Sequence, residues 1–269
     1  MPKPSNAGYA ALDREEVLAF LFHPRKEYAG HAAPGSAREV LIPVADDVAV
    51  GGRFHMAHPG GPNILFFHGN GEIVADYDDF GPVYNQMGIN FLPVDYRGYG
   101  RSSGRPTVTA MMRDCRTIFD FTRRWLRDNR YRGPLVVMGR SLGSASALEL
   151  AWRYPGQVDA LVIESGFAWA GPLLQLLGVN LAAIGFEEAE GFGHTDKIKT
   201  FEKPTLIIHA EYDHIIPFSD GKALFDACPS PDKRFLKIPG ANHNDILMRG
   251  MTDYLAAIKS LVESLLSTL

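Results

Sequence analysis

The sequence predicts an α/β protein built on a mostly parallel sheet with helices on both faces. Short apolar runs rich in Val, Ile, Leu and Phe recur along the 269-residue chain, and most are continuous enough to be strands buried on both faces. Segments with helical spacing separate the later runs, and strands that alternate with helices favour parallel pairing. Because the chain contains no repeat or low-complexity tract, we expect one continuous domain over residues 1–269.

The predicted strands follow one another from an edge of the sheet. The first two runs, EVLIPVAD and VAVGGRFHMA, are separated by the turn residues Asp46 and Asp47 and are typical of an antiparallel hairpin. The later runs are more continuously apolar, which favours burial on both faces. They are NILFFHG, INFLPVDYRG, PLVVMGRS, DALVIES, PTLIIHAEYD and RFLKIPGANH.

Three helices are predicted from the spacing of apolar residues. In residues 107–129, apolar positions recur at helical intervals with Arg and Asp between them, which indicates an amphipathic helix. Residues 144–154 form a second helical pattern, which Pro155 and Gly156 stop. An apolar stripe from Tyr254 onward predicts that the chain ends on a third helix.

A long interval separates Ser165 from Pro204. It exceeds what a simple helix crossover needs, and its first half is strongly apolar. We interpret residues 168–200 as a small lid inserted into the domain. The alternative is a plain core helix followed by a loop.

Composition excludes several classes of protein. The net charge is −4, with 46% hydrophobic and 22% charged residues, and basic residues are interleaved with acids, so no nucleic-acid partner is expected. The stretch MPKPSNAGYAALDREEVLAF lacks the pattern of a signal peptide, and no window reaches ~18 uninterrupted apolar residues. We expect a cytoplasmic protein without a membrane anchor. Cys115 and Cys228 do not imply a disulfide framework.

The stretch GRSLGS places one serine between two glycines, where a predicted strand meets a predicted helix. Residues 139–143 have the form G-x-S-x-G, which is typical of a nucleophile on a strand–turn–helix. The glycines allow neighbouring backbone to pack against a sharp turn that exposes the hydroxyl of Ser141. The alternative is that Ser141 only caps the following helix.

A serine hydroxyl is a poor nucleophile near neutral pH and needs a base and a group that orients this base. Asp213 ends the strand in LIIHAEYDHIIP, and His243 follows the next strand in FLKIPGANHND. Sites in parallel sheets lie at the carboxyl ends of the strands, where these side chains are expected to meet Ser141. The order Ser141, Asp213, His243 supports a catalytic triad. Glu164, which ends another strand, is the alternative acid.

The motif FFHGNG ends an early strand and supplies candidates for an oxyanion hole. We assign the two donors to the backbone N–H groups of Asn70 and Leu142. His68 is interpreted as structural, with a ring that holds the loop in shape. Asp95, in DYRGYGRS, is interpreted as part of the scaffold.

The motifs FFHGNG, DYRGYGRS, GRSLGS, EYDHIIP and GANHND, in this order, resemble the α/β-hydrolase superfamily. The resemblance covers about residues 38–269 and is to the branch of uncharacterised bacterial serine hydrolases and eukaryotic protein depalmitoylases. It implies an α/β-hydrolase fold with an eight-stranded, mostly parallel sheet, a Ser-Asp-His triad and no cofactor. The sequence departs from the depalmitoylases because it lacks their cysteine-rich, lipidated N-terminus, and from related oligopeptidases because it lacks their N-terminal propeller.

We therefore expect a serine hydrolase that cleaves carboxylic esters of small to medium acyl groups through an acyl-enzyme. Thioester or amide hydrolysis by the same triad is the alternative among enzymes, and a non-catalytic binding protein is the alternative outside them. No His or Cys pair has metal spacing, and neither G-x-G-x-x-G nor a Walker loop occurs, so neither a metal nor another cofactor is expected. The expected partner is a small-molecule ester, and the oligomeric state is left open.

The apolar residues of the lid segment follow a strand that ends at the active edge. We expect several of them to line an acyl pocket above Ser141. The candidates are Trp169, Leu173, Leu177 and Ile184, and the same stretch holds Leu174, Leu176, Val179 and Leu181. The alternative is that this stripe only packs the segment onto the sheet.

Overall fold

The computed structural model describes residues 8–28, 35 and 37–267 of the chain. Within them, eight strands form one open sheet with the order β1-β2-β4-β3-β5-β6-β7-β8. This architecture confirms the predicted fold class. The signal-peptide argument falls partly on residues 1–7, which lie outside the described residues.

The sheet begins with an antiparallel hairpin and continues as parallel strands. Strand β1 (Arg38–Ala45) pairs with β2 (Val48–Phe54), and the turn lies at the two predicted aspartates. Strand β2 is antiparallel to β4 (Asn90–Val94), and every later pairing is parallel. The remaining strands are β3 (Asn63–Phe67), β5 (Leu135–Arg140), β6 (Ala160–Glu164), β7 (Thr205–Ala210) and β8 (Lys233–Ile238).

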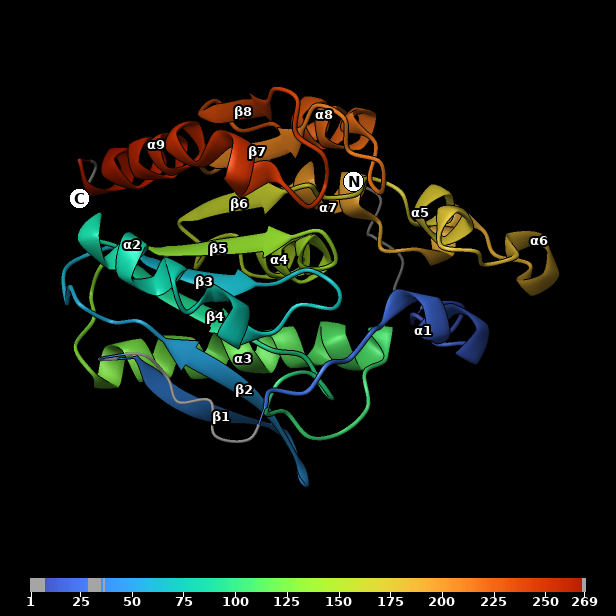
Figure 1. Cartoon of the computed structure of the whole chain (residues 1–269), viewed down its shortest axis with the longest axis horizontal. Helices are drawn as coiled ribbons and strands as arrows, with labels where there is room; N and C mark the ends of the chain where they lie inside the picture. The colour runs from blue at the N-terminus through green and yellow to red at the C-terminus, as the bar shows by residue number, and fades with distance from the viewer. Residues whose placement is uncertain (1–7, 29–34, 36, 268–269) are drawn as a thin grey trace.

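Helices cover both faces of this sheet (Figure 1). Helices α3 (Val108–Asp128), α4 (Gly143–Arg153) and α8 (Phe218–Ala227) pack on one face, and α2 (Phe80–Gln86) and α9 (Ile246–Leu266) pack on the other. The three predicted helices are confirmed as α3, α4 and α9. Helix α3 begins where predicted because the Thr107 hydroxyl accepts a hydrogen bond from the Ala110 N–H at 3.0 Å.

Alternate residues of each central strand enter separate cores, because successive side chains of a strand point to opposite faces. Leu65 and Phe67 of β3 pack towards α3 and α4, whereas Ile64 and Phe66 pack towards α2 and α9. The edge strand β8 differs from the prediction of burial on both faces. Residues 233–236 are partly exposed and Lys237 is exposed, because β8 is an edge strand with no neighbouring strand on one side.

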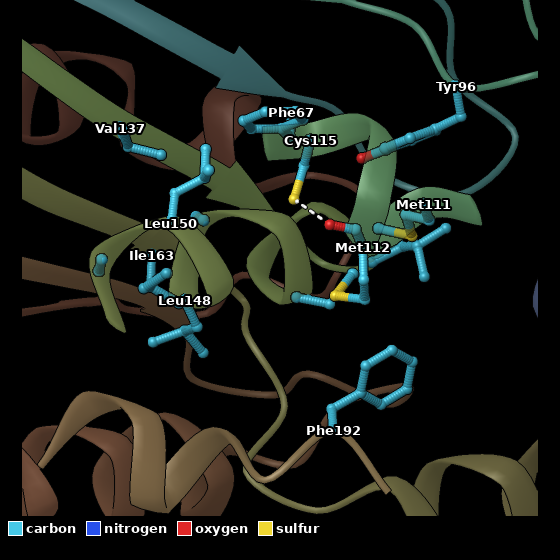
Figure 2. Packing of buried hydrophobic residues seen from close by; sticks show 14 of the residues in the cluster. Phe67, Tyr96, Met111, Met112, Cys115, Val137, Leu148, Leu150, Ile163 and Phe192 are labelled. Atoms are coloured by element: carbon cyan, nitrogen blue, oxygen red, sulfur yellow. Dashed lines mark hydrogen bonds between the residues drawn. The ribbon is translucent and has the colours of Figure 1, made fainter. Parts of the chain in front are cut away.

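Figure 2 shows the core under α3 and α4, where Met111, Met112 and Cys115 lie among apolar side chains from the strands. The Cys115 thiol donates to the carbonyl oxygen of Met112 at 3.2 Å, and burial raises its pKa. Cys115 and Cys228 are both buried free thiols. Among the described residues, no helix combines the length and the apolar character needed to cross a membrane.

The segment 168–200 forms several short elements instead of one core helix. They are α5 (Ala170–Leu176), α6 (Leu181–Ile184), η2 (Glu188–Glu190) and α7 (His194–Ile198). Helices α5 and α6 lie beyond the carboxyl ends of the strands, beside α1 (Glu15–Leu21) (Figure 1). Helix α7 instead packs on α4, where the Lys197 ammonium lies 2.9 Å from the Glu149 carboxylate.

Candidate active site

The turn between β5 and α4 holds Ser141 in a conformation that few non-glycine residues adopt. Its φ angle is +50°, in the left-handed region, which costs backbone energy. A Cβ atom on Gly139 would lie 2.3 Å from the carbonyl oxygen of Gly143, and one on Gly143 would lie 2.0 Å from that of Phe67. Both glycines are therefore required by close backbone approach, as the sequence predicted.

Three side chains from separate loops meet at this turn. The Ser141 hydroxyl lies 3.0 Å from Nε2 of His243, and Nδ1 of His243 lies 2.8 Å from Oδ2 of Asp213. Because an ionised carboxylate can only accept, Nδ1 carries the proton and Nε2 is free to accept from the serine hydroxyl. The structure thus brings together the serine, base and acid expected from the sequence.

The Asp213 carboxylate is held by the loop that carries it. Its Oδ1 accepts hydrogen bonds from the backbone N–H groups of Ile215, at 3.0 Å, and Ile216, at 2.8 Å. Burial acts to raise the pKa of Asp213, but the hydrogen bonds from His243 and these N–H groups outweigh it and lower the pKa. The carboxylate therefore stays ionised and can stabilise a protonated His243.

Glu164, the alternative acid, has other partners. Its Oε1 lies 3.0 Å from Nε of Arg140, and its Oε2 accepts a hydrogen bond from the Tyr254 hydroxyl at 2.7 Å. Burial raises the pKa of Glu164, and the charge of Arg140 opposes this shift. The ring of His243 hydrogen-bonds to Asp213 and not to Glu164.

The two backbone N–H groups expected to form an oxyanion hole belong to residues that line the same cleft as Ser141. Among the described residues, neither Asn70 nor Leu142 donates its backbone N–H to a protein acceptor. The Asn70 side chain holds its loop in place, because its Oδ1 accepts from the His23 N–H at 2.8 Å and the Tyr99 hydroxyl at 2.6 Å. Both residues line the cleft that contains Ser141.

His68 and Asp95 lie beneath this loop and are fully buried. The ring nitrogens of His68 lie 2.8 Å from the carbonyl oxygen of Gly69 and 3.2 Å from Oδ1 of Asp95. Asp95 also accepts the backbone N–H of Val74 at 3.1 Å. These contacts hold the loop that carries Asn70, in keeping with the structural interpretation of both side chains.

A cleft of about 230 Å³ opens above Ser141. Its apolar lining comes from α1, the turn after β5, α5 and the Asp213 loop, and comprises Leu21, Leu142, Leu173, Leu177 and Ile215. Its polar lining comprises His23, Asn70, Glu72, Arg140, Ser141, His243 and Asn244.

The structure divides the expected pocket residues into separate groups. Leu173 and Leu177 line the cleft, whereas Trp169 and Ile184 are not among its described lining residues. Trp169 precedes α5 and is 38% exposed, and Ile184 lies farther along the chain at the end of α6. Leu174 is fully buried in the core beside Leu173, because adjacent residues of a helix face different directions.

The remaining three residues of the stretch also differ in environment. Val179 is buried, Leu181 packs on the core while partly exposed, and Leu176 is mostly exposed. Some residues of this apolar stretch therefore pack in the core, and others form part of the cleft wall.

Sequence reasoning did not identify several residues of the cleft. Leu21 and His23 come from α1 and the residues after it, which carry only a short amphipathic pattern with acidic residues in the first turn. Arg140 lies inside the motif GRSLGS, at a position where the pattern G-x-S-x-G allows any residue, and Glu72 directly follows the motif FFHGNG. No local signal connects these positions, because their contacts depend on strand order.

The sheet order, the strained turn after β5 and the site at the strand ends are those of one fold class. The chain has the α/β-hydrolase fold. Residues 61–186 match the hydrolase family described as serine aminopeptidase, S33. This match includes the turn with Ser141 and the loop with Asn70.

The chain is also similar in sequence to proteins of the branch expected from its motifs. It is 32% identical over 210 residues to the human α/β-hydrolase domain-containing protein 17B, covering 74% of this chain and 65% of that protein. It is 28% identical over 209 residues to the protein aho-3 of Caenorhabditis elegans, covering 74% of this chain and 57% of that protein. The chain thus spans less than two thirds of the length of these relatives.

Solved structures share the fold at lower sequence identity. The Pyrococcus furiosus esterase Pf2001 aligns with a TM-score of 0.72 at 15% identity, covering 90% of this chain and 98% of that one. A CIB-like hydrolase from Thermoplasma acidophilum aligns with a TM-score of 0.63 at 21% identity, covering 86% of this chain and 99% of that one.

Proposed function

We propose that this protein is a serine hydrolase that cleaves carboxylic esters through an acyl-enzyme. The observation that carries the proposal is the unbroken hydrogen-bonded chain from Ser141 through His243 to Asp213 at the floor of a cleft. A binding protein would not need a base 3.0 Å from a serine held in a strained backbone conformation.

The first half of the reaction forms the acyl-enzyme. His243 Nε2 takes the proton of the Ser141 hydroxyl as Oγ attacks the ester carbonyl, and Asp213 stabilises the resulting imidazolium. The negative charge that develops on the carbonyl oxygen is stabilised by the N–H groups of Asn70 and Leu142. As the intermediate collapses, His243 returns the proton to the leaving alkoxide, which departs as an alcohol.

The second half regenerates the enzyme. Water enters in place of the alcohol, His243 removes its proton, and the hydroxide attacks the acyl carbonyl. The same two N–H groups hold the second oxyanion. Collapse of this intermediate expels Ser141 Oγ, which regains the proton from His243, and releases the carboxylic acid.

The cleft supports an acyl chain of short to medium length. Leu173 and Leu177 contribute apolar surface from α5, and Leu21 contributes it from α1. Each methylene buried there is worth ~0.8 kcal/mol, so rates should rise from acetyl towards butyryl or hexanoyl esters and fall once the cleft is full. In this proposal residues 168–200 act as a lid over the site, with α7 as the part fixed to the domain.

A fluorophosphonate probe tests the nucleophile directly. The probe should label Ser141, as located by mass spectrometry, and Ser141→Ala should abolish both labelling and turnover of an activated ester. Ser146→Ala is the matched control, because it removes a buried hydroxyl from α4 nearby and should leave labelling intact. Labelling of Ser141→Ala at the wild-type rate would refute the assignment.

The type of bond cleaved requires a separate comparison. Ester, thioester and aminoacyl amide substrates with the same acyl group should be compared by kcat/KM. The proposal expects the ester to be turned over fastest. If the thioester or the amide is hydrolysed faster, the triad assignment stands, but the proposal that the substrate is an ester is wrong.

A further inference from the structure

The side chain of Arg140 reaches from the serine turn to three other parts of the site. Arg140 directly precedes Ser141 and is 9% exposed. One guanidinium nitrogen lies 3.1 Å from Oε1 of Glu72, Nε lies 3.0 Å from Oε1 of Glu164, and the other terminal nitrogen donates to the backbone carbonyl of His243 at 2.9 Å. A planar guanidinium can make these contacts at once, because its donors point in fixed, divergent directions.

The contact with Glu72 extends to the oxyanion loop, residues 68–71, which carries Asn70. The second carboxylate oxygen of Glu72 accepts the backbone N–H of Gly69 at 2.6 Å and the Tyr77 hydroxyl at 2.7 Å. Gly69 directly precedes Asn70, whose backbone N–H is one of the two proposed oxyanion donors. Burial acts to raise the pKa of Glu72, but the charge of Arg140 and the hydrogen bonds outweigh it and lower the pKa. Glu72 is therefore ionised and stays paired with Arg140.

The contact with His243 fixes the backbone of the loop that carries the base. Residues of this loop also bond to one another, as in the hydrogen bond from Asn242 N–H to Asp245, and to the loop that carries Asp213, as in the hydrogen bond from Tyr212 N–H to the Ala241 carbonyl at 2.8 Å. Among the described residues, Arg140 is the one that donates a hydrogen bond to the backbone carbonyl oxygen of His243. The guanidinium thus connects this loop to the turn that carries Ser141.

We propose that Arg140 is a positioning residue that sets the mutual placement of the Ser141 turn, the His243 loop and the Asn70 N–H, with Glu72 as its link to the oxyanion loop. The inference rests on the proposed serine hydrolase function. In this role Arg140 needs the shape of its guanidinium, which contacts three groups at once, as well as its positive charge.

Arg140→Lys separates geometry from charge, because lysine keeps the charge but cannot reach Glu72, Glu164 and the His243 carbonyl from one fixed plane. Since a displacement of about 1 Å can reduce turnover on the order of 10²-fold, we expect kcat of Arg140→Lys to fall by ~10–100-fold. The KM should change by less than about threefold, because the apolar wall of the cleft is untouched.

Arg53→Lys is the matched control for the loss of a buried arginine network. Arg53 is 1% exposed and pairs with Glu27, Glu39 and Asp78, and it does not line the cleft. Both variants should melt at lower temperature than the wild type. Only Arg140→Lys should lose kcat, and equal kcat losses in the two variants would refute a specific positioning role.

Glu72→Gln provides a second measurement if Arg140→Lys fails to fold. Its amide oxygen can still accept the Gly69 N–H, but the charge that holds Arg140 is removed, so we expect kcat to fall by ~10-fold. The downfield proton NMR signal of His243 Nδ1–H should shift or broaden in this variant. An unchanged kcat and an unchanged signal would overturn the proposal.

The two hypotheses fail in different ways. If wild-type protein does not react with a fluorophosphonate at Ser141, the hydrolase proposal fails. If wild-type protein reacts and Arg140→Lys keeps the wild-type kcat, only the positioning role is wrong.

Discussion

Truncation of Leu177 tests whether the cleft above Ser141 binds the acyl chain. Leu177 lines the cleft at the end of α5, and Leu→Ala removes three carbon atoms from that wall. The vacated space accommodates two to three additional methylenes of a substrate. Because each buried methylene contributes ~0.8 kcal/mol, every extra carbon accommodated should raise kcat/KM about fourfold.

The assay is kcat/KM for p-nitrophenyl esters from acetyl to decanoyl. Relative to wild type, the optimum of Leu177→Ala should move by two to three carbons towards longer chains. Two additional methylenes change the ratio of long-chain to short-chain kcat/KM by about 15-fold. Leu173→Ala, on the same wall, should shift the profile in the same direction.

Leu174→Ala is the control, since this side chain is on the same helix but fully buried in the core. Its truncation should cost about 2–5 kcal/mol of unfolding free energy and lower the melting temperature. Its chain-length profile should match that of the wild type. If Leu173→Ala and Leu177→Ala lower the melting temperature but keep the wild-type profile, the stripe only packs the segment onto the domain and the pocket assignment is wrong.

Three other predictions follow from the site and its surroundings. Asp213→Asn should reduce kcat on the order of 10⁴-fold, because the amide does not hold His243 in the required tautomer, whereas a larger loss in Glu164→Gln would show that the acid was misassigned. Burial lowers the pKa of His194 to about 3, and the unfolded chain titrates near 6.5, so the unfolded state binds the proton first. The contribution of His194 to the free energy of unfolding should therefore be complete above about pH 6.5 and fall below it, by about 2 kcal/mol at pH 5. Urea unfolding at the two pH values should show a smaller decrease in His194→Asn than in the wild type. An equal decrease in both proteins would contradict this cause. Ester turnover should persist in EDTA, and its recovery only on addition of a divalent cation would refute the metal-free mechanism.

Much of the fold was predictable because it depends on local pattern. Runs such as NILFF are apolar at every position, as required of a strand with a core on each face, and β3 is buried throughout. The long helices α3, α4 and α9 carry apolar stripes that persist over several turns. The short helices α1, α2 and α8 were not predicted, because seven to ten residues give too few turns to establish a period.

The sequence by itself determined the order of the candidate catalytic residues and their location at strand ends. Ser141, Asp213 and His243 each follow an apolar run, and parallel strands present their carboxyl ends at one edge. Glu164 satisfies the same local rule, so the sequence left two candidate acids.

Only the tertiary structure shows which of these two carboxylates hydrogen-bonds to His243 and which residues form the walls of the cleft. Strand order places Asp213 at the ring of His243 and pairs Glu164 with Arg140. Packing of α1 against α5 brings Leu21 and Leu177, which are far apart in the sequence, to the wall of one cleft. Periodicity encodes the face on which a side chain lies, but its neighbours across a cleft are set by how the elements pack in three dimensions, and that arrangement has no local signature in the chain.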